Sequence, residues 1–204
     1  MKIIVFGASG GTGHHFVEQA LQAGHEVSAF VRSSARIEMS DPKLQVIVGD
    51  ACDPIAVKEA VASHDAVVVS LGVRGSSKSL LLSEMTGNIM DGMRDHGINR
   101  VLYVAAAGIY NEIPGIVGMA SKIFLRHVLA DHRSAVERIK SSHAIWTIAR
   151  PLHLIDTPLT GKYRATMQGV PVGGQKIARA DVAHFLLHAL SHERHERTSV
   201  GLAY

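Results

Sequence analysis

An apolar run that stops at a glycine-rich turn is the feature of this chain that most restricts its fold. Residues 2–6, KIIVF, are nearly all apolar, which is typical of a strand buried on both faces of a parallel sheet. Gly7, Gly10 and Gly13 follow at a spacing of three, and the residues after them have the apolar spacing of a helix. Glycine permits the positive φ of a tight turn. The segment therefore predicts a strand, a tight turn and a helix in succession.

Apolar runs and helical patterns go on alternating through the rest of the chain. We expect strands over residues 2–6, 26–31, 44–48, 66–70, 101–105, 144–149 and 199–204. We expect helices over residues 13–23, 54–62, 79–96, 132–141 and 181–190, the second of them capped by Asp53 ahead of Pro54. Residues 106–130 indicate a loop with one or two short helices, and residues 151–174 a loop with short strands. The alternation predicts an α/β fold, a doubly wound parallel sheet that forms a single domain over residues 1–204.

Composition excludes several classes of partner. The chain has 204 residues, of which 47% are apolar, enough for one α/β domain with a full core. Its net charge is only +3 and no lysine or arginine block stands out, so we expect no nucleic-acid partner. No apolar stretch approaches the ~18 residues of a membrane span, so we expect no membrane partner either. Cys52 is the single cysteine, which favours a reducing, cytoplasmic setting. We expect a monomer or weak homodimer.

The glycine-rich turn suggests a bound pyrophosphate. Glycines let the backbone approach the phosphates, and the helix that follows points its free N–H groups at them. Ser9 and Thr12 offer hydroxyl donors beside Gly10 and Gly11. The alternative is a tight turn without a ligand, but three glycines weaken a fold unless something requires them. Ligands of such sheets bind at the carboxyl ends of the strands, so a dinucleotide is expected there.

The residues after the second expected strand discriminate between cofactors. Proteins that bind NAD usually place an acid there, to hold the ribose hydroxyls. Here the sequence is Phe30 to Arg36, FVRSSAR, with no acid. Arg32 and Arg36 are suited to clamp a 2′-phosphate and Ser33 to donate to it, so NADP(H) is favoured over NAD(H). The alternative is that both arginines are solvated loop charges.

Two further strand ends are candidates for contact with the dinucleotide. Asp50 and Ala51 follow the third expected strand, where a side chain can reach the adenine. A purely turn-forming role for Asp50 is nearly as well supported. Leu71 and Gly72 end the fourth strand, and a glycine there lets the backbone pass close to the cofactor.

At this level of detail the chain resembles a known family, the atypical short-chain dehydrogenases, and most closely their biliverdin-IXβ reductase/flavin reductase group. The resemblance runs over nearly the whole chain. Its strongest stretches are Ile4–Gly13, Gln22–Val27, Val31–Arg32, Val48–Asp50, Leu71–Arg74, Pro151–His153, Pro158–Gly161, and Asp181 with His184–Phe185. It implies a Rossmann-like fold.

The resemblance also implies an activity. Members of that group bind NADPH and pass hydride to flavins, open-chain tetrapyrroles or related conjugated acceptors, so FMN or FAD would be a substrate and not a resident cofactor. By resemblance, Arg32 and Arg36 bind the 2′-phosphate. The resemblance also implies that His153, just after Pro151 and Leu152, lies beside the nicotinamide at the end of the sixth strand. A small-molecule acceptor is the partner this implies.

The chain departs from its relatives at two places that concern proton transfer. Alcohol-oxidising relatives use a Tyr-x-x-x-Lys pair, whereas Tyr103, Tyr110 and Tyr163 are followed four residues on by Ala107, Pro114 and Met167. Ala106 stands where most relatives have a serine. Alcohol oxidation needs a positioned acid–base group, whereas flavin or quinone reduction mainly needs the acceptor stacked on the nicotinamide, with protons from water. The second case fits better.

Several other side chains are candidates for the acceptor end of the site. His153 is the best candidate for positioning the acceptor, with a solvent-exposed loop histidine as the alternative. Arg74, Ile109 and Tyr110 are the candidates for contact with the substrate. His184, His188, His192 and His195 are spaced as if on one helix face. No known ligand pattern accompanies them, so we expect a polar face and no metal.

Two functions remain open at this stage. The first is an NADPH-dependent reductase of flavins, biliverdin-like tetrapyrroles or other flat conjugated acceptors. The second is a redox sensor that holds NADP(H) without turnover and resembles NmrA-like regulators, for which Ala106 is the best support. An epimerase or lyase on this fold is disfavoured by the missing Tyr-x-x-x-Lys.

Overall fold

A mostly parallel sheet forms the centre of the molecule. The computed structural model describes residues 1–72 and 80–204, except the side chains of residues 116, 117, 121 and 122. Over these residues the strands are ordered β3-β2-β1-β4-β5-β6-β10-β8, and β8 alone is antiparallel to its neighbour. Their bounds are β1 Lys2–Phe6, β2 Glu26–Val31, β3 Leu44–Val48, β4 Ala66–Val69, β5 Arg100–Val104, β6 Ile145–Pro151, β8 Arg164–Thr166 and β10 Thr198–Ala203. The doubly wound order expected from the sequence is confirmed.

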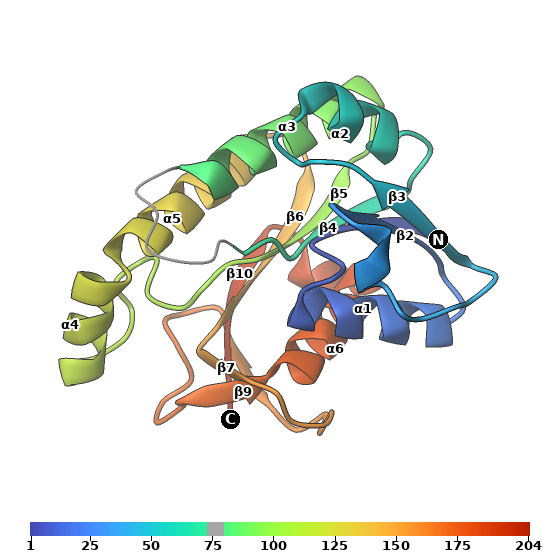
Figure 1. Cartoon of the computed structure of the whole chain (residues 1–204). Helices are drawn as coiled ribbons and strands as arrows, with labels where there is room; N and C mark the ends of the chain where they lie inside the picture. The colour runs from blue at the N-terminus through green and yellow to red at the C-terminus, as the bar shows by residue number, and fades with distance from the viewer. Residues whose placement is uncertain (73–79) are drawn as a thin grey trace.

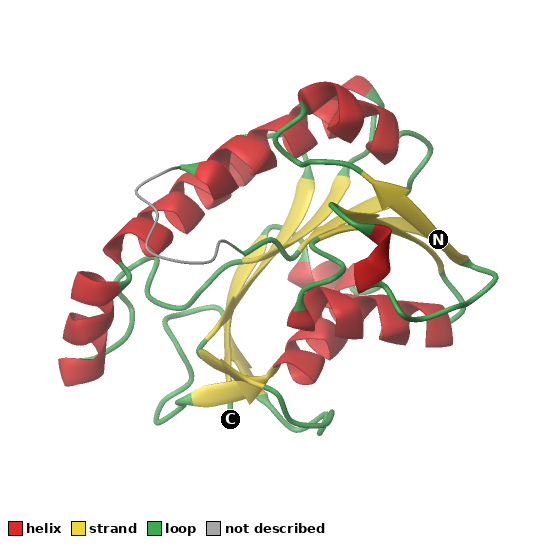
Figure 2. Ribbon diagram, viewed as in Figure 1, coloured by secondary structure: helices red, strands yellow, loops and turns green. Residues whose placement is uncertain are grey.

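Helices cover both faces of this sheet, as Figures 1 and 2 show. One face carries α1 (Gly11–Gln22) and α6 (Arg179–Leu190), and the other carries α2 (Pro54–Val61), α3 (Leu81–Asp95) and α5 (Arg126–Lys140). The short helix α4 (Gly115–Phe124) precedes α5. Two single 3-10 turns, η1 (Ser34–Arg36) and η2 (Glu193–His195), follow β2 and α6. A separate parallel pair, β7 (His153–Ile155) and β9 (Lys176–Ala178), lies beyond the end of β6.

Strand β1 has a hydrophobic core on each of its two faces, which explains its unbroken apolar run. Ile4 and Phe6 belong to the core on the α2–α3–α5 side, and Ile3 and Val5 to the core on the α1–α6 side. All four are fully buried. Successive side chains of a strand point to opposite faces, so only a continuous apolar run can fill both cores.

Local signals located the ends of the expected elements to within two residues, with one exception. Asp53 caps α2 as expected, since its carboxylate accepts hydrogen bonds from the backbone N–H of Ile55 at 2.9 Å and of Ala56 at 3.3 Å. Helix α5 is the exception, because it begins at Arg126, six residues before the expected start at 132. Its N-cap position is Leu125, which offers no capping side chain. The start of α5 therefore carries no sequence signal.

Helix α3 is capped by another helix. Its own N-cap residue, Leu80, makes no side-chain cap. The buried Asp131 of α5 instead accepts hydrogen bonds from the N–H groups of Leu82 and Ser83, both at 2.8 Å. A carboxylate at a helix N-terminus is favourable because it satisfies free N–H groups and meets the positive end of the helix dipole. The fold thus supplies a cap that the local sequence does not encode.

Within the described residues, none of the helices is both long and apolar enough to cross a membrane.

Candidate dinucleotide and acceptor site

The glycine-rich turn joins β1 to α1 at the carboxyl edge of the sheet. Gly7 has a φ of +83°, and a β-carbon there would lie 2.4 Å from the carbonyl oxygen of Ser70. A β-carbon on Gly13 would lie 2.2 Å from the carbonyl oxygen of Gly7. Packing alone therefore requires these two glycines. Gly10 is exposed, and its added β-carbon would lie 3.2 Å from the Gly7 oxygen and 3.9 Å from the Ser70 oxygen, so close packing constrains Gly10 less than Gly7 or Gly13.

The first turn of α1 is open to an anion. Its N-cap residue is Gly10, no side chain caps it, and its first turn contains no acid. Ser9, Gly10 and Gly11 are exposed, whereas Thr12 is buried. Free N–H groups at an exposed helix N-terminus bind phosphate oxygens readily. The uncapped turn is thus suited to an anion, and its contact with a pyrophosphate stays a prediction.

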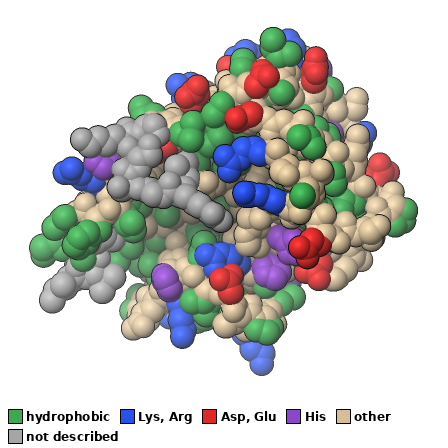
Figure 3. All heavy atoms as spheres, in the orientation of Figure 1, with side chains coloured by type: hydrophobic (Ala, Val, Ile, Leu, Met, Phe, Trp, Pro, Cys, Tyr) green, Lys and Arg blue, Asp and Glu red, His purple; other side chains and the backbone are tan. Residues whose placement is uncertain are grey.

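Positively charged side chains follow β2, the strand that pairs with β1. Arg32 and Ser33 follow β2, Arg36 ends the 3-10 turn η1, and all three are exposed. No ion pair between described residues engages Arg32 or Arg36. Lysine and arginine side chains gather near the middle of the face shown in Figure 3. This edge offers guanidinium groups and no carboxylate from Phe30 to Arg36.

Asp50 shapes a turn of its own. Its carboxylate accepts a hydrogen bond from the N–H of Cys52 at 3.0 Å. Ala51 is buried, and its carbonyl accepts from the side chain of Asn88 at 3.0 Å. The pKa of the Cys52 thiol is raised, first by burial and then by Asp50. Turn formation accounts for Asp50, and contact of Asp50 or Ala51 with adenine stays a prediction.

Leu71 and Gly72 follow β4 at the carboxyl edge of the sheet. Ser70 still bonds to β1, with its N–H 2.8 Å from the carbonyl oxygen of Phe6. Leu71 is half-buried against the core, and Gly72 is exposed, with no atom of the described residues within 4 Å of an added β-carbon. Arg74, expected to contact the substrate, lies outside the described residues.

Ala106 and His153 lie at the ends of β5 and β6. The N–H groups of Ala105 and Ala107 bond to the carbonyl oxygens of Ala149 and Pro151 at 2.8 and 2.9 Å, which places Ala106 beside Pro151. Leu152 bonds to β10 through Leu202. His153 begins β7, is exposed, and donates its N–H to the carbonyl of Gln175 at 3.2 Å. We call Gly72, Ala106 and His153 the acceptor surface.

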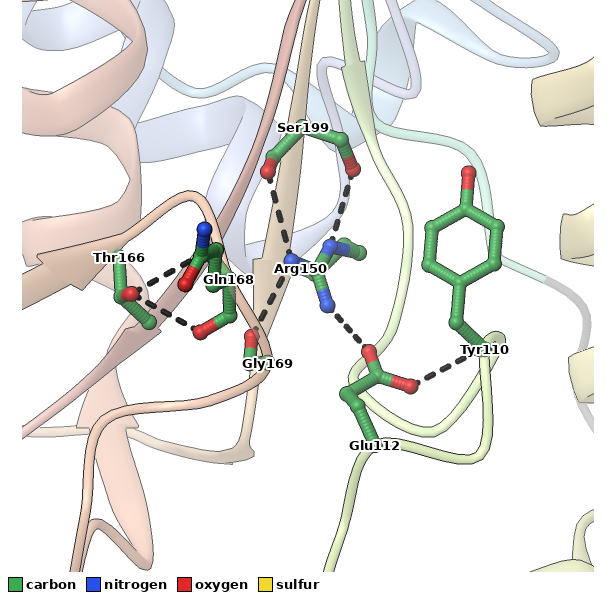
Figure 4. A network of polar contacts seen from close by, with 7 residues as sticks. All are labelled: Tyr110, Glu112, Arg150, Thr166, Gln168, Gly169 and Ser199. Carbon is green, nitrogen blue, oxygen red and sulfur yellow. Dashed lines mark hydrogen bonds and ion pairs between the residues drawn. The ribbon is translucent and has the colours of Figure 1, made fainter.

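A buried network supports this end of the sheet, and sequence reasoning missed it. Arg150 is 2% exposed, forms an ion pair with Glu112, and donates to Ser199 and to the carbonyl of Gly169 (Figure 4). Glu112 in turn accepts from the backbone N–H of Tyr110 at 2.9 Å. The network therefore ties the loop after β5 to β6 and β10. An arginine inside the apolar strand IWTIARP was the available signal.

Two side chains that we expect from the sequence to contact the substrate point in other directions. Ile109 is 3% exposed and belongs to the core under α5. The ring of Tyr110 lies against that core, with the Lys140 ammonium 4.7 Å from its centroid. We therefore leave Ile109 and Tyr110 out of the acceptor surface.

A second polar cluster fixes the segment after β7. Asp181 of α6 is fully buried. Its carboxylate accepts from the N–H of Gly161 at 2.7 Å, from the hydroxyl of Thr160 at 2.9 Å and from Tyr204 at 2.6 Å. These bonds give the PLTG stretch and Asp181 one shared role, which is to attach a loop to the first turn of a helix.

The four C-terminal histidines do not share one helix face. Helix α6 ends at Leu190, so His192 and His195 lie beyond it. His184 bonds to the Tyr163 hydroxyl, whose pKa is raised to about 12, first by burial and then by Asp181. His188 and His192 stack with ring centroids 3.7 Å apart. Among the described residues there is no group of three or more His, Cys, Asp or Glu side chains placed to hold a metal.

Comparison with known proteins identifies the class to which this fold and glycine turn belong. Residues 7–193 match the NAD(P)H-binding family, and the chain belongs to that family. The uncharacterized protein YwnB of Bacillus subtilis is 28% identical over 207 residues, which cover 96% of this chain and 95% of YwnB. It is a relative of matching length, and its name assigns no activity.

Two solved structures share the fold. A short-chain dehydrogenase/reductase from Veillonella parvula, solved in complex with NADP, is 20% identical with a TM-score of 0.85, covering 100% of this chain and 94% of that one. ChuY of Escherichia coli O157:H7, described as an anaerobilin reductase, is 23% identical with a TM-score of 0.83, covering 100% and 97%. The chain thus has the fold of NAD(P)H-binding oxidoreductases. Membership of the biliverdin-IXβ reductase group is not confirmed.

Proposed function

We propose that this protein is an NADPH-dependent reductase that passes a hydride to a flat conjugated acceptor such as a flavin or an open-chain tetrapyrrole. One juxtaposition carries the proposal. The uncapped, exposed first turn of α1 lies beside the end of β2, where Arg32 and Arg36 are exposed and no acid follows the strand. The same edge of the sheet carries the acceptor surface.

The dinucleotide is assigned to the first half of this edge. The pyrophosphate would lie over the exposed Gly10, with the α1 N–H groups as donors and Ser9 beside them. Arg32, Ser33 and Arg36 would hold the 2′-phosphate, which favours NADPH over NADH.

The acceptor surface would position a ring and donate no proton to it. Ala106 is small and has no hydroxyl, and no Tyr-x-x-x-Lys pair exists in the sequence. When bound, NADPH supplies a hydride from its nicotinamide and becomes NADP⁺, while the acceptor also takes one proton from water. His153 is exposed and free to stack against a flat ring. Stacking geometry in place of acid–base chemistry suits a conjugated acceptor.

The second candidate function is a redox sensor that binds NADP(H) without turnover. Ala106 is the observation that favours it, because the residue offers no polar group to orient a substrate.

Turnover separates the two functions. The purified protein is mixed with NADPH and, in turn, FMN, FAD, biliverdin and a soluble quinone, and the loss of NADPH absorbance is followed. We expect oxidation with at least one acceptor and none without. Gly10→Val is the matched control, because a side chain there fills the space over the turn and should abolish binding while the fold survives. Tight NADPH binding without turnover of any acceptor would refute the reductase and favour the sensor.

A further inference from the structure

One arginine outside the glycine-rich turn lies directly over it. Helices α1 and α6 pack side by side (Figure 1). The Gln19 side chain of α1 donates to the carbonyl of Ala180 in α6 at 3.0 Å. From the first residue of α6, the Arg179 side chain extends toward the N-terminus of α1. A β-carbon added to Gly11 would lie 2.4 Å from its Cδ and 3.0 Å from its Nε. The guanidinium group is therefore carried to the first turn of α1.

The charge of Arg179 has a weak partner. Nη1 of Arg179 lies 2.7 Å from Oδ1 of Asp156. Among the described residues, Asp156 is the sole hydrogen-bonding partner of the Arg179 guanidinium. The Asp156 side chain is 80% exposed and that of Arg179 only 28%. An ion pair with so exposed a carboxylate contributes little, because water and salt screen it. Arg179 is thus held near the turn mainly by its packing and is available to a stronger anion.

Asp156 is itself close to the turn. Its Oδ1 would lie 3.7 Å from a β-carbon on Gly11. Asp156 belongs to the segment that Asp181 attaches through Thr160 and Gly161. A carboxylate so near a helix N-terminus occupies the region that an anionic ligand of that helix would approach.

We propose that Arg179 binds the pyrophosphate of the dinucleotide and that Asp156 is its partner only in the free protein. On binding, the guanidinium exchanges one carboxylate oxygen for phosphate oxygens, to which its planar fork donates two parallel hydrogen bonds. Asp156 is released to solvent. The proposal rests on the dinucleotide binding that the family implies and is independent of which acceptor is reduced.

The pyrophosphate is common to NADPH and NADH, so the proposal predicts an effect that Arg32 cannot produce. Arg179→Met keeps an apolar stem over Gly11 and removes the charge. We expect roughly tenfold or greater weakening of both dinucleotides, as for the loss of a charge-assisted phosphate contact, with their affinity ratio unchanged. The measurement is titration of nicotinamide fluorescence with NADPH and with NADH, with Arg32→Ala as the control that should weaken NADPH alone. Unchanged affinities, or weakening of NADPH alone, would overturn the assignment.

Asp156→Asn tests the exchange. Removing a competing carboxylate should tighten both dinucleotides a few-fold, within the range of an exposed ion pair. Weaker binding would mean that Asp156 aims Arg179 in the complex, and the exchange would be wrong.

Arg179→Lys, which keeps the charge without the planar fork, should retain part of the affinity. It replaces Arg179→Met in the test if that variant unfolds. Thermal unfolding of the ligand-free variants separates a lost contact from a lost fold. Because the readout is binding, a failed reductase assay leaves this test intact.

Discussion

The two halves of the carboxyl edge are built in different ways. The half that we assign to the dinucleotide consists of one contiguous stretch, β1, the glycine turn, α1 and the end of β2, from Lys2 to Arg36. We call this the contiguous half. The other half, which we call the assembled half, contains the acceptor surface and takes Gly72, Ala106 and His153 from three separate connections. Buried polar groups hold that second half together, above all Arg150 with Glu112. A local motif can be recognised from its own residues, whereas an assembled surface depends on contacts between distant parts of the chain.

The largest expected effect is on the assembled half. Arg150→Met leaves the carboxylate of Glu112, whose side chain is 8% exposed, without its partner. Breaking a buried ion pair on one side typically destabilises a fold by roughly 3–5 kcal/mol. Urea unfolding should show this loss, and Arg150→Met with Glu112→Gln should recover part of it. A loss below ~1 kcal/mol would mean that the network does not support this half.

Acid should weaken the assembled half through a second buried group. Burial lowers the pKa of His132 to about 4, and its ring bonds to the Tyr103 hydroxyl at 2.9 Å. In the unfolded chain a histidine takes up a proton near pH ~6.5, so stability is complete above that pH and falls as the pH drops toward 4. The full difference is on the order of 3 kcal/mol.

The comparison of two unfolding curves measures this effect. His132→Gln removes the titration and keeps a polar partner for Tyr103. The wild-type protein should lose more unfolding free energy between neutral pH and pH ~4.5 than this variant does. Equal losses would show that His132 is not the group responsible.

The contiguous half should lose affinity without losing stability. Arg32 is exposed and forms no ion pair among the described residues, so Arg32→Ala should leave unfolding unchanged. Losing a charge-assisted phosphate contact weakens NADPH by roughly 1.5–3 kcal/mol, about ten- to a hundredfold, with little change for NADH. Titration with both dinucleotides checks this. An equal loss for both would contradict the assignment to the 2′-phosphate.

The smallest effect is expected at the acceptor surface. If His153 only stacks against the ring, His153→Ala should raise KM for FMN and change kcat modestly. The pH–rate profile should then have no step near the ~6.5 of an ordinary histidine. His96→Ala, an exposed histidine at the end of α3, is the control and should change neither constant. A fall in kcat of about a hundredfold would make His153 a proton donor instead. Unchanged kinetics would place the acceptor elsewhere.

Sequence reasoning predicted the contiguous half well because its signals are local. The run KIIVF and the glycine spacing each indicate a conformation within a few residues, as the Asp53 cap does for α2 outside that half. It predicted the assembled half less well. Ile109 and Tyr110 were expected at the substrate, yet they pack under α5, because a loop's direction is set by what holds it. This loop is held by the ion pair between Glu112 and Arg150, which are 38 positions apart in the sequence.

The sequence by itself therefore determined the parallel sheet, its two cores and the turn suited to a dinucleotide, since periodicity and glycine conformation act over short distances. The tertiary structure decided where charge and caps are shared between elements. Asp131 caps a helix that it does not belong to, and Asp181 attaches a loop to α6. Arg179 is brought over a turn 168 positions away, at Gly11. Hydrogen bonds and ion pairs act over a few ångströms in space, and only folding brings such distant residues within that range.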